Sequence, residues 1–198
     1  NDGIFQFSLI SLLSLKREGV TQSAAVGVAE KVCVFLMLVS SAYMQSISAF
    51  VAQNNGAGRA DRSRKALLYG IRTALMAGLA MSALAFFGGS ALSAVFSSDP
   101  AVIQAAHQYL KAYGIDCILT AVLFCFLGYF NGCGRTMFVM FQGIVGAFCV
   151  RIPVVWLISH LEGATLFQIG LATPTSSVVQ IILCIIAYRV YQKKRSVL

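Results

Sequence analysis

Six apolar segments separated by short polar breaks constrain the fold of this 198-residue chain more than any other feature. They cover about residues 3–15, 21–53, 66–97, 100–131, 136–159 and 164–191. A helix needs about 20 residues to cross a hydrocarbon core roughly 30 Å thick, so the last five segments are long enough to span a membrane. The first is too short. Because the chain begins at Asn1, without an initiating methionine or a signal peptide, we expect a fragment cut inside its first membrane helix.

The composition agrees with an all-α integral membrane protein. Hydrophobic residues make up 58% of the chain and charged residues only 11%, whereas a soluble domain carries roughly 25% charged residues. The net charge of +8 does not indicate nucleic-acid binding, because the basic residues gather at the ends of apolar segments rather than among aromatic residues. The 6 cysteines lie in or beside apolar segments without metal-ligand spacing, so we expect small buried hydrophobes and no metal site.

Prolines and polar breaks mark where the helices begin, end and bend. Asp99 before Pro100 predicts a helix N-cap followed by a proline at the first helical position. Pro153 and Pro174 lie inside apolar segments, where each should kink the helix and free a backbone carbonyl. Such discontinuities serve transport in some membrane proteins and are simple structural kinks in others, and the sequence leaves both readings open.

The distribution of basic residues predicts the orientation of the chain in the membrane. Lys16, Arg17 and Lys111 lie on one side. The opposite side carries a larger set: Arg59, Arg62, Arg64, Lys65, Arg72, Arg135, Arg189, Lys193, Lys194 and Arg195. Cytoplasmic loops carry the excess of Lys and Arg. We therefore expect a multi-pass protein of the plasma (cytoplasmic) membrane, with the loop at 50–66 and the C-terminus in the cytoplasm.

Three apolar segments each carry polar residues at helical spacing, which predicts a shared wet interior. The stripes comprise Glu30, Met37, Ser41, Gln45 and Ser48, then Tyr109, Tyr113, Asp116 and Thr120, and finally Thr173, Ser177 and Gln180. Hydrogen bonds between membrane helices explain the Ser and Thr positions equally well. Asp116, Glu30, Tyr113 and Gln45 are the candidates for cation coupling or substrate binding.

Four charged residues stand out inside the hydrocarbon zone of the apolar segments: Glu30, Lys31, Asp116 and Arg151. An unpaired charge at mid-membrane costs roughly 3 kcal/mol or more, so such groups usually face a cavity or a partner. We expect Asp116 and Glu30 to face the interior, with at least one of them near Arg151 or Lys31. Direct function and static ion pairing both remain open.

The stretch FVAQNNGAGRADRSRKA, residues 50–66, resembles the cytoplasmic signature loop of the multidrug and toxic compound extrusion (MATE) transporters, in which Gln53, Asn54, Gly56 and Gly58 are the positions of interest. The flanking stretches GVTQSAAVGVAEKVCVFLMLVSSAYMQSISAF and GYFNGCGRTMFVMFQGIVGAFCVRIPVVW agree with it. The resemblance implies a twelve-helix transporter of two lobes, of which residues 1–198 would be the C-terminal six-helix lobe with its first helix truncated.

The same resemblance implies the function. Such proteins are secondary antiporters rather than enzymes, and export amphipathic, often cationic, organic compounds by alternating access. The coupling ion would be a proton or sodium, with no other cofactor. The partners would be small organic cations or amphipathic drugs, the lipid bilayer and the missing N-terminal lobe, with no nucleic acid.

Two features depart from the family pattern. The first segment, GIFQFSLISLL, has no carboxylate within it, and Asp2 and Gln6 are the nearest polar residues. Asp116 lies about one turn from the position of the family's fourth-helix aspartate. Both departures argue against a sodium site in this lobe.

Two other functions deserve comparison. A lipid-linked saccharide flippase of the same superfamily would hold a pyrophosphate with Arg151 and Lys31. An intramembrane serine protease would explain GGSA at residues 88–91, but its catalytic histidine belongs in the sixth segment, which contains none.

Overall fold

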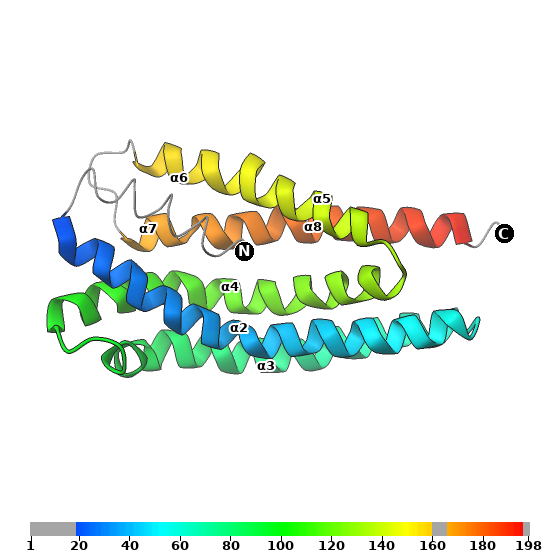
Figure 1. Ribbon diagram of the computed structural model, residues 1–198, viewed down its shortest axis with the longest axis horizontal. Helices are drawn as coiled ribbons and strands as arrows, with labels where there is room; N and C mark the ends of the chain where they lie inside the picture. Colours follow the sequence, from blue (N-terminus) through cyan, green and yellow to red (C-terminus); the bar gives the residue numbers. More distant parts are fainter. Residues whose placement is uncertain (1–18, 160–165, 196–198) are drawn as a thin grey trace.

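The computed structural model describes residues 19–159 and 166–195, and this part of the chain is a bundle of long helices joined by short turns (Figure 1). The predicted short segment at 3–15 lies outside the described residues. The helices are α2 (Gly19–Gly56), α3 (Ala60–Ala94), α4 (Pro100–Gly132), α5 (Thr136–Ile144), the π-helix η1 (Val145–Arg151), α6 (Ile152–Ser159), α7 (Leu166–Gly170) and α8 (Ala172–Arg195).

Five stretches of the described chain are long and apolar enough to cross a membrane: Ala24–Gly56, Ala60–Ala94, Pro100–Gly132, Thr136–Leu157 and Ala172–Lys193. They coincide with the five long segments predicted from the sequence. Large apolar side chains on their outer faces are exposed, including Phe87 at 83% and Met76 at 73%. Outer faces of this kind suit a hydrocarbon environment, so the fold is that of a multi-pass, all-α membrane protein.

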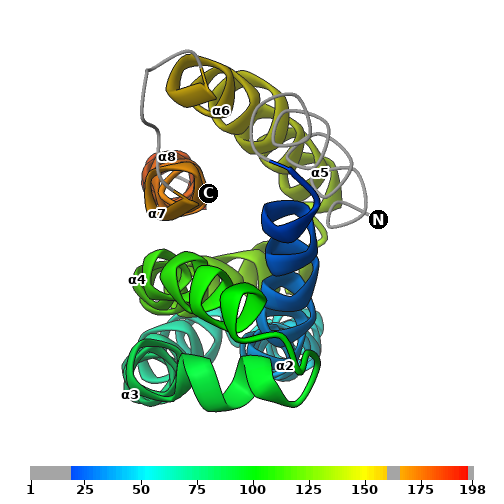
Figure 2. The ribbon, with the colours of Figure 1, turned by 90° about the vertical axis from the view of Figure 1, so that its left-hand side faces the viewer.

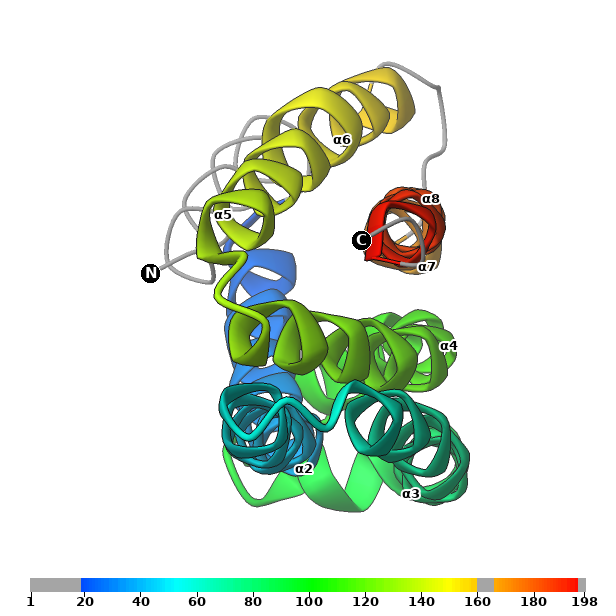
Figure 3. The same cartoon turned by 90° about the vertical axis from the view of Figure 1, so that its right-hand side faces the viewer.

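Helix α4 is the centre of the bundle. It packs against α2, α3, α7 and α8, and the end-on views show it between the α2–α3 pair and α8 (Figures 2 and 3). Two apolar clusters surround it. One joins α4 to α2 and α3 near residues such as Val32 and Leu110, and the other extends to α8 through Tyr129 and Cys184.

Two glycines allow α4 to approach α2 closely. A Cβ atom at Gly128 would lie 2.5 Å from the backbone oxygen of Met44, and one at Gly132 would lie 2.6 Å from the backbone oxygen of Ser48. Small residues four positions apart are typical of tightly packed membrane helices. This close approach was not predicted, although the spacing of Gly128 and Gly132 is visible in the sequence.

The predicted cap at Asp99 is confirmed. Its carboxylate accepts a hydrogen bond of 2.9 Å from the backbone N–H of Ala101, and Pro100 is the first residue of α4. The backbone N–H groups of a first helical turn have no partner within the helix, so the aspartate satisfies one of them.

The helical stretch 136–159 is continuous but not uniform. Its middle is η1, where the backbone N–H of Ile152 bonds to the oxygen of Ala147, five residues back. Pro153 follows directly and has no N–H to donate, so normal α-helical bonding cannot be completed at this point. The irregular segment ends at Arg151, the residue that the sequence analysis singled out in this helix.

The last predicted segment is interrupted at Leu171, between α7 and α8. Pro174 is the third residue of α8, and a proline in the first turn costs little because its missing N–H would have had no helical partner. The discontinuity therefore lies three residues before the proline and immediately precedes Ala172 and Thr173.

Candidate functional site

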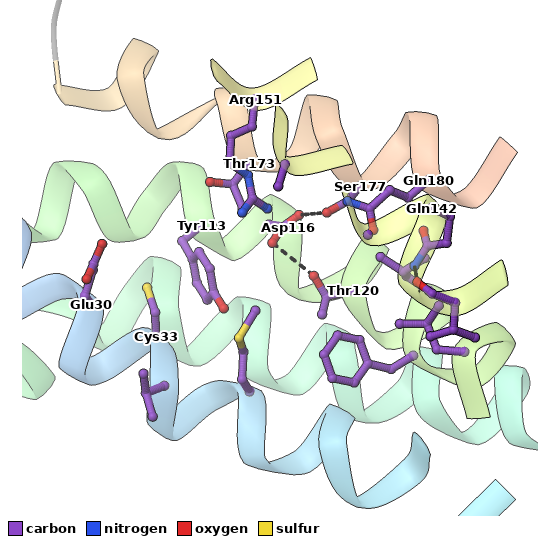
Figure 4. Close-up of a pocket in the computed structure, with 18 of the residues that line it drawn as sticks. Glu30, Cys33, Tyr113, Asp116, Thr120, Gln142, Arg151, Thr173, Ser177 and Gln180 are labelled. Atoms are coloured by element: carbon purple, nitrogen blue, oxygen red, sulfur yellow. Dashed lines mark hydrogen bonds between the residues drawn. The ribbon is translucent and has the colours of Figure 1, made fainter. Parts of the chain in front are cut away.

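A cavity of about 370 Å³ lies between α2, α4, α5, η1 and α8 (Figure 4). Its walls combine ionisable and polar side chains with apolar ones. The residues that line it include Glu30, Cys33, Met37, Tyr109, Tyr113, Asp116, Thr120, Phe124, Leu127, Gln142, Arg151, Thr173, Ser177 and Gln180. The three polar stripes predicted from the sequence thus contribute to one interior.

Asp116 is the most deeply buried carboxylate of this cavity, with 1% of its surface exposed. One carboxylate oxygen accepts a hydrogen bond of 2.6 Å from Ser177 Oγ on α8, and the other accepts one of 2.9 Å from Thr120 Oγ1, a turn further along α4. A buried carboxylate needs such donors. These bonds fix the position of Asp116 and join α4 to α8.

Arg151 and Glu30 bring two further charges to the cavity. Arg151 extends from η1 toward Asp116 and Thr173, and its positive charge is close enough to act on the Asp116 carboxyl (Figure 4). Glu30, on α2, lies at the far end of the cavity, near Cys33 (Figure 4). The structure therefore gathers these three charges, while ion pairing between them stays a prediction.

The remaining predicted site residues fall into two groups. Tyr113 is buried and lines the cavity beside Asp116. Lys31 is exposed, with its ammonium 5.9 Å from the centre of the Phe96 ring, and Gln45 is exposed, with its nearest hydrogen-bonding neighbour Ser41 Oγ at 3.5 Å. Neither Lys31 nor Gln45 is among the residues that line the cavity.

The signature loop predicted at 50–66 is shorter in the structure, because α2 continues to Gly56 and α3 begins at Ala60, which leaves only residues 57–59 between the helices. Asn54 is buried and donates a hydrogen bond of 2.8 Å to the backbone oxygen of Phe50, one turn back in α2. Gly58 has a φ of 71°, a backbone conformation that favours glycine, whereas Gln53 and Gly56 are exposed.

The loop is also tied to its neighbours. Asn55 donates to Cys133 Sγ at 3.2 Å, next to the α4–α5 turn, and accepts a hydrogen bond of 3.3 Å from Ser63 Oγ in α3. These bonds connect three helices at one end of the bundle. The signature loop thus has a structural role at some distance from the cavity-lining residues.

Gln142 is a cavity residue that the sequence analysis missed. It comes from α5, has 2% of its surface exposed, and donates a hydrogen bond of 3.3 Å to the backbone oxygen of Val139. The signal was available, because Gln142 is a single amide in the middle of the apolar segment 136–159. It had no polar neighbours at helical spacing and so did not form a stripe.

Cysteines and metal-binding groups add little to the site. All 6 cysteines are free thiols; most are buried, as predicted, but Cys149 is exposed on the outer side of η1. The prediction of burial was wrong for Cys149, because in a membrane protein an apolar side chain is equally at home facing lipid. Within residues 19–159 and 166–195, no cluster of three His, Cys, Asp or Glu residues has the arrangement of a metal site.

Long apolar helices around a cavity lined by polar and apolar side chains define a multi-pass, all-α membrane protein. The model of the MatE family matches residues 4–157 of the chain. The chain therefore belongs to the MatE family, which confirms the resemblance drawn from the signature loop and its flanks.

A curated relative and two solved structures agree with this assignment. A protein from Shewanella oneidensis named "FAD transporter" is 27% identical over 162 residues, which is 81% of this chain and 35% of that protein. The crystal structure of a MATE protein in complex with MaD3S has a TM-score of 0.82 at 16% identity and covers 98% of this chain and 43% of its own. The Vibrio cholerae MATE transporter VcmN, crystallised as a mutant, has a TM-score of 0.83 at 15% identity, with 98% and 42% covered.

At these identities the solved structures establish the fold alone. The chain spans less than half the length of each of these three proteins. All three are described as MATE proteins or transporters, in agreement with the prediction of a transporter rather than an enzyme.

Proposed function

We propose that this chain is the C-terminal lobe of a secondary antiporter of the plasma membrane, with its C-terminus in the cytoplasm. The transporter exports amphipathic, mainly cationic, organic compounds by alternating access, driven by a proton or sodium gradient. The observation that carries this proposal is Asp116, a carboxylate held by two hydroxyl groups in the wall of an intramembrane cavity.

The charges of the cavity support a cationic substrate. Glu30 and Asp116 supply two carboxyl groups, against the single guanidinium of Arg151. A carboxylate inside a membrane can exchange its neutralising partner, whether a proton, a sodium ion or a cationic drug. Competition between the ion and the drug for Asp116 would couple their opposite movements.

The test is Asp116→Asn in the intact transporter. The amide has the same shape and still accepts hydrogen bonds, but it cannot carry the exchangeable charge. We expect cationic-dye efflux to fall at least tenfold with normal membrane yield. Asp99→Asn is the matched control, because asparagine caps a helix as well as aspartate does and Asp99 lies outside the cavity lining.

Yield and efflux must be measured together. A low yield of Asp116→Asn would assign Asp116 to a static pair, since removing one partner leaves a buried cation uncompensated. Normal yield with normal efflux would contradict the coupling role.

A flavin dinucleotide is the second candidate substrate. The relative named "FAD transporter" matches 81% of this chain, and Arg151 offers a cation for an anionic pyrophosphate. A lipid-linked saccharide flippase would use the same chemistry. It has less support, because Arg151 is the single basic residue among the described residues that line the cavity, and Lys31 lies outside them.

A further inference from the structure

We propose that Gln142 recognises substrate through its side-chain oxygen, which accepts a hydrogen bond from an amine N–H attached to a planar heteroaromatic ring. This inference rests on the proposed function, since it names a chemical feature of the exported compound. It gives a role in substrate binding to the end of the cavity that the charged residues do not occupy.

The unpartnered oxygen of Gln142 is the first observation. Oε1 is buried and accepts no hydrogen bond from any group that the structure describes. The orientation of the amide is set by its other end, where Nε2 donates to the Val139 carbonyl oxygen at 3.3 Å. Reversing the amide would place its oxygen against the carbonyl oxygen of Val139, and both are acceptors. The orientation is therefore fixed, and Oε1 is the amide atom left without a partner among the described residues.

A buried acceptor without a donor is costly. Leaving such a group unsatisfied costs about 1–3 kcal/mol, which is why nearly all buried polar atoms have partners. A cavity-lining side chain that bears this cost has an acceptor ready for a ligand. Gln142 meets that description, because it is 2% exposed and belongs to the cavity wall.

The neighbouring polar groups are already engaged. Gln180 Nε2 donates to Ser176 Oγ at 3.1 Å, and Ser176 Oγ donates to the backbone oxygen of Gly146 at 2.9 Å. The bond from Ser176 to Gly146 joins α8 to η1, and the bond from Gln180 to Ser176 lies within α8. Figure 4 places Gln142 and Gln180 at the opposite end of the site from Glu30, with Asp116 between them. Gln142 Oε1 is thus a buried acceptor of this end that has no donor among the residues the structure describes.

The chemistry of the subsite selects its ligand. A neutral amide oxygen accepts a hydrogen bond from an N–H group. A ring-bound amine whose nitrogen carries two alkyl groups has no N–H to donate to it. Phe124 and Leu127 provide apolar walls for a flat ring. The volume of about 370 Å³ lies within the roughly 300–1,000 Å³ range of small-molecule pockets and suits a compound of a few fused rings.

The experiment uses two cationic acridine dyes that differ in their N–H groups. Proflavine carries two primary amines, and acridine orange carries dimethylamines at the same positions. Binding of each dye to the purified intact transporter is followed by fluorescence polarisation, for wild type, Gln142→Leu and the control Gln104→Leu. Gln104 is an exposed glutamine of α4 that does not line the cavity.

We expect Gln142→Leu to weaken proflavine binding about five- to tenfold, the worth of one hydrogen bond to a buried amide, and to leave acridine orange binding unchanged. Gln104→Leu should bind both dyes as wild type does. The decisive quantity is the ratio of the two dissociation constants. A ratio that is the same in wild type and Gln142→Leu would overturn the inference, because a size difference between the dyes affects both proteins equally.

Other outcomes separate this inference from the proposed function. If wild type binds neither dye and exports neither, the proposed function fails and the inference fails with it. If wild type exports both dyes but the ratio does not depend on Gln142, only the inference fails. Should Gln142→Leu not reach the membrane, Gln142→Met removes the same acceptor with an unbranched side chain of similar length and gives the same test.

Discussion

At the scale of single residues, the cavity combines groups of opposite charge in different surroundings. Asp116 is fully enclosed and holds two hydroxyl donors, whereas Glu30 is only partly buried at the far end. Arg151 reaches the same space from an irregular helix. A substrate that bears a cation would meet Asp116, and one that bears an anion would meet Arg151. Substitution of Arg151 therefore distinguishes the two candidate substrates.

Arg151→Met should lower export of FAD about tenfold or more, because an anionic pyrophosphate loses its charged hydrogen-bond partner in a site of low dielectric constant. Export of a cationic dye should change by less than about threefold, since a cation gains nothing from a nearby guanidinium. Both activities are measured in proteoliposomes prepared at equal protein content.

Arg151→Lys serves as the control, because it keeps the positive charge without the planar guanidinium. If Arg151→Met lowers both activities equally while its yield is normal, Arg151 does not select between substrates. Absence of FAD export by wild type would remove the second candidate.

At the scale of helices, much of the fold follows from segment length and capping. The five long spans and the Asp99 cap were predicted because about 20 apolar residues and an Asp-Pro pair have few alternative structures. The π-helix at 145–151 was not predicted, since its residues read as an ordinary apolar helix until Pro153. The close approach of α2 and α4 was also missed, because it depends on which face of α4 its glycines occupy.

Gly128→Ala tests that close approach. The added methyl group would lie 2.5 Å from the Met44 carbonyl oxygen, so α2 and α4 must separate. Overpacking of this kind costs about 1–3 kcal/mol, and we expect a lower thermal unfolding temperature and a lower membrane yield. Unfolding is followed by loss of the monodisperse gel-filtration peak after heating.

Gly143→Ala is the matched control for this substitution. Gly143 also lies in a membrane helix, but a Cβ atom there meets nothing within 4 Å. We expect Gly143→Ala to unfold at or slightly above the wild-type temperature, since alanine favours helix more than glycine does. Equal unfolding temperatures for Gly128→Ala and wild type would show that α4 and α2 can separate freely.

At the scale of the whole molecule, the sequence indicated which helices form the cavity but not every residue that lines it. Five residues of the stripes on three helices line one cavity: Glu30, Tyr113, Asp116, Ser177 and Gln180. Gln45 belongs to the same stripe as Glu30, and Lys31 is the charged residue next to Glu30, but neither lines the cavity. A stripe predicts a face of a helix, and in a long helix that face turns from the interior to the outside along its length. Whether a given part of the stripe is buried depends on the helices packed against it, and these come from other parts of the chain.

Orientation in the membrane is the remaining prediction for the whole molecule. Helix α3 has 35 residues and a length of roughly 52 Å, so it extends well beyond a 30 Å hydrocarbon core. Its first turns carry Arg62, Arg64 and Lys65, and the charge asymmetry predicts that this end lies in the cytoplasm. The turn between α3 and α4, with the exposed Ser98, is then expected on the outside.

Cysteine labelling checks this orientation. In a Cys149→Ser background, which removes the exposed native thiol, Ser98→Cys should react with a membrane-impermeant maleimide in intact cells. Arg62→Cys should react only after the membrane is opened, because the excess of basic residues holds its loop on the cytoplasmic side. The opposite pattern, with Arg62→Cys labelled in intact cells and Ser98→Cys protected, would reverse the topology and place the signature loop outside. Labelling of both positions in intact cells would instead indicate leaky membranes, which a cytosolic marker protein detects in the same sample.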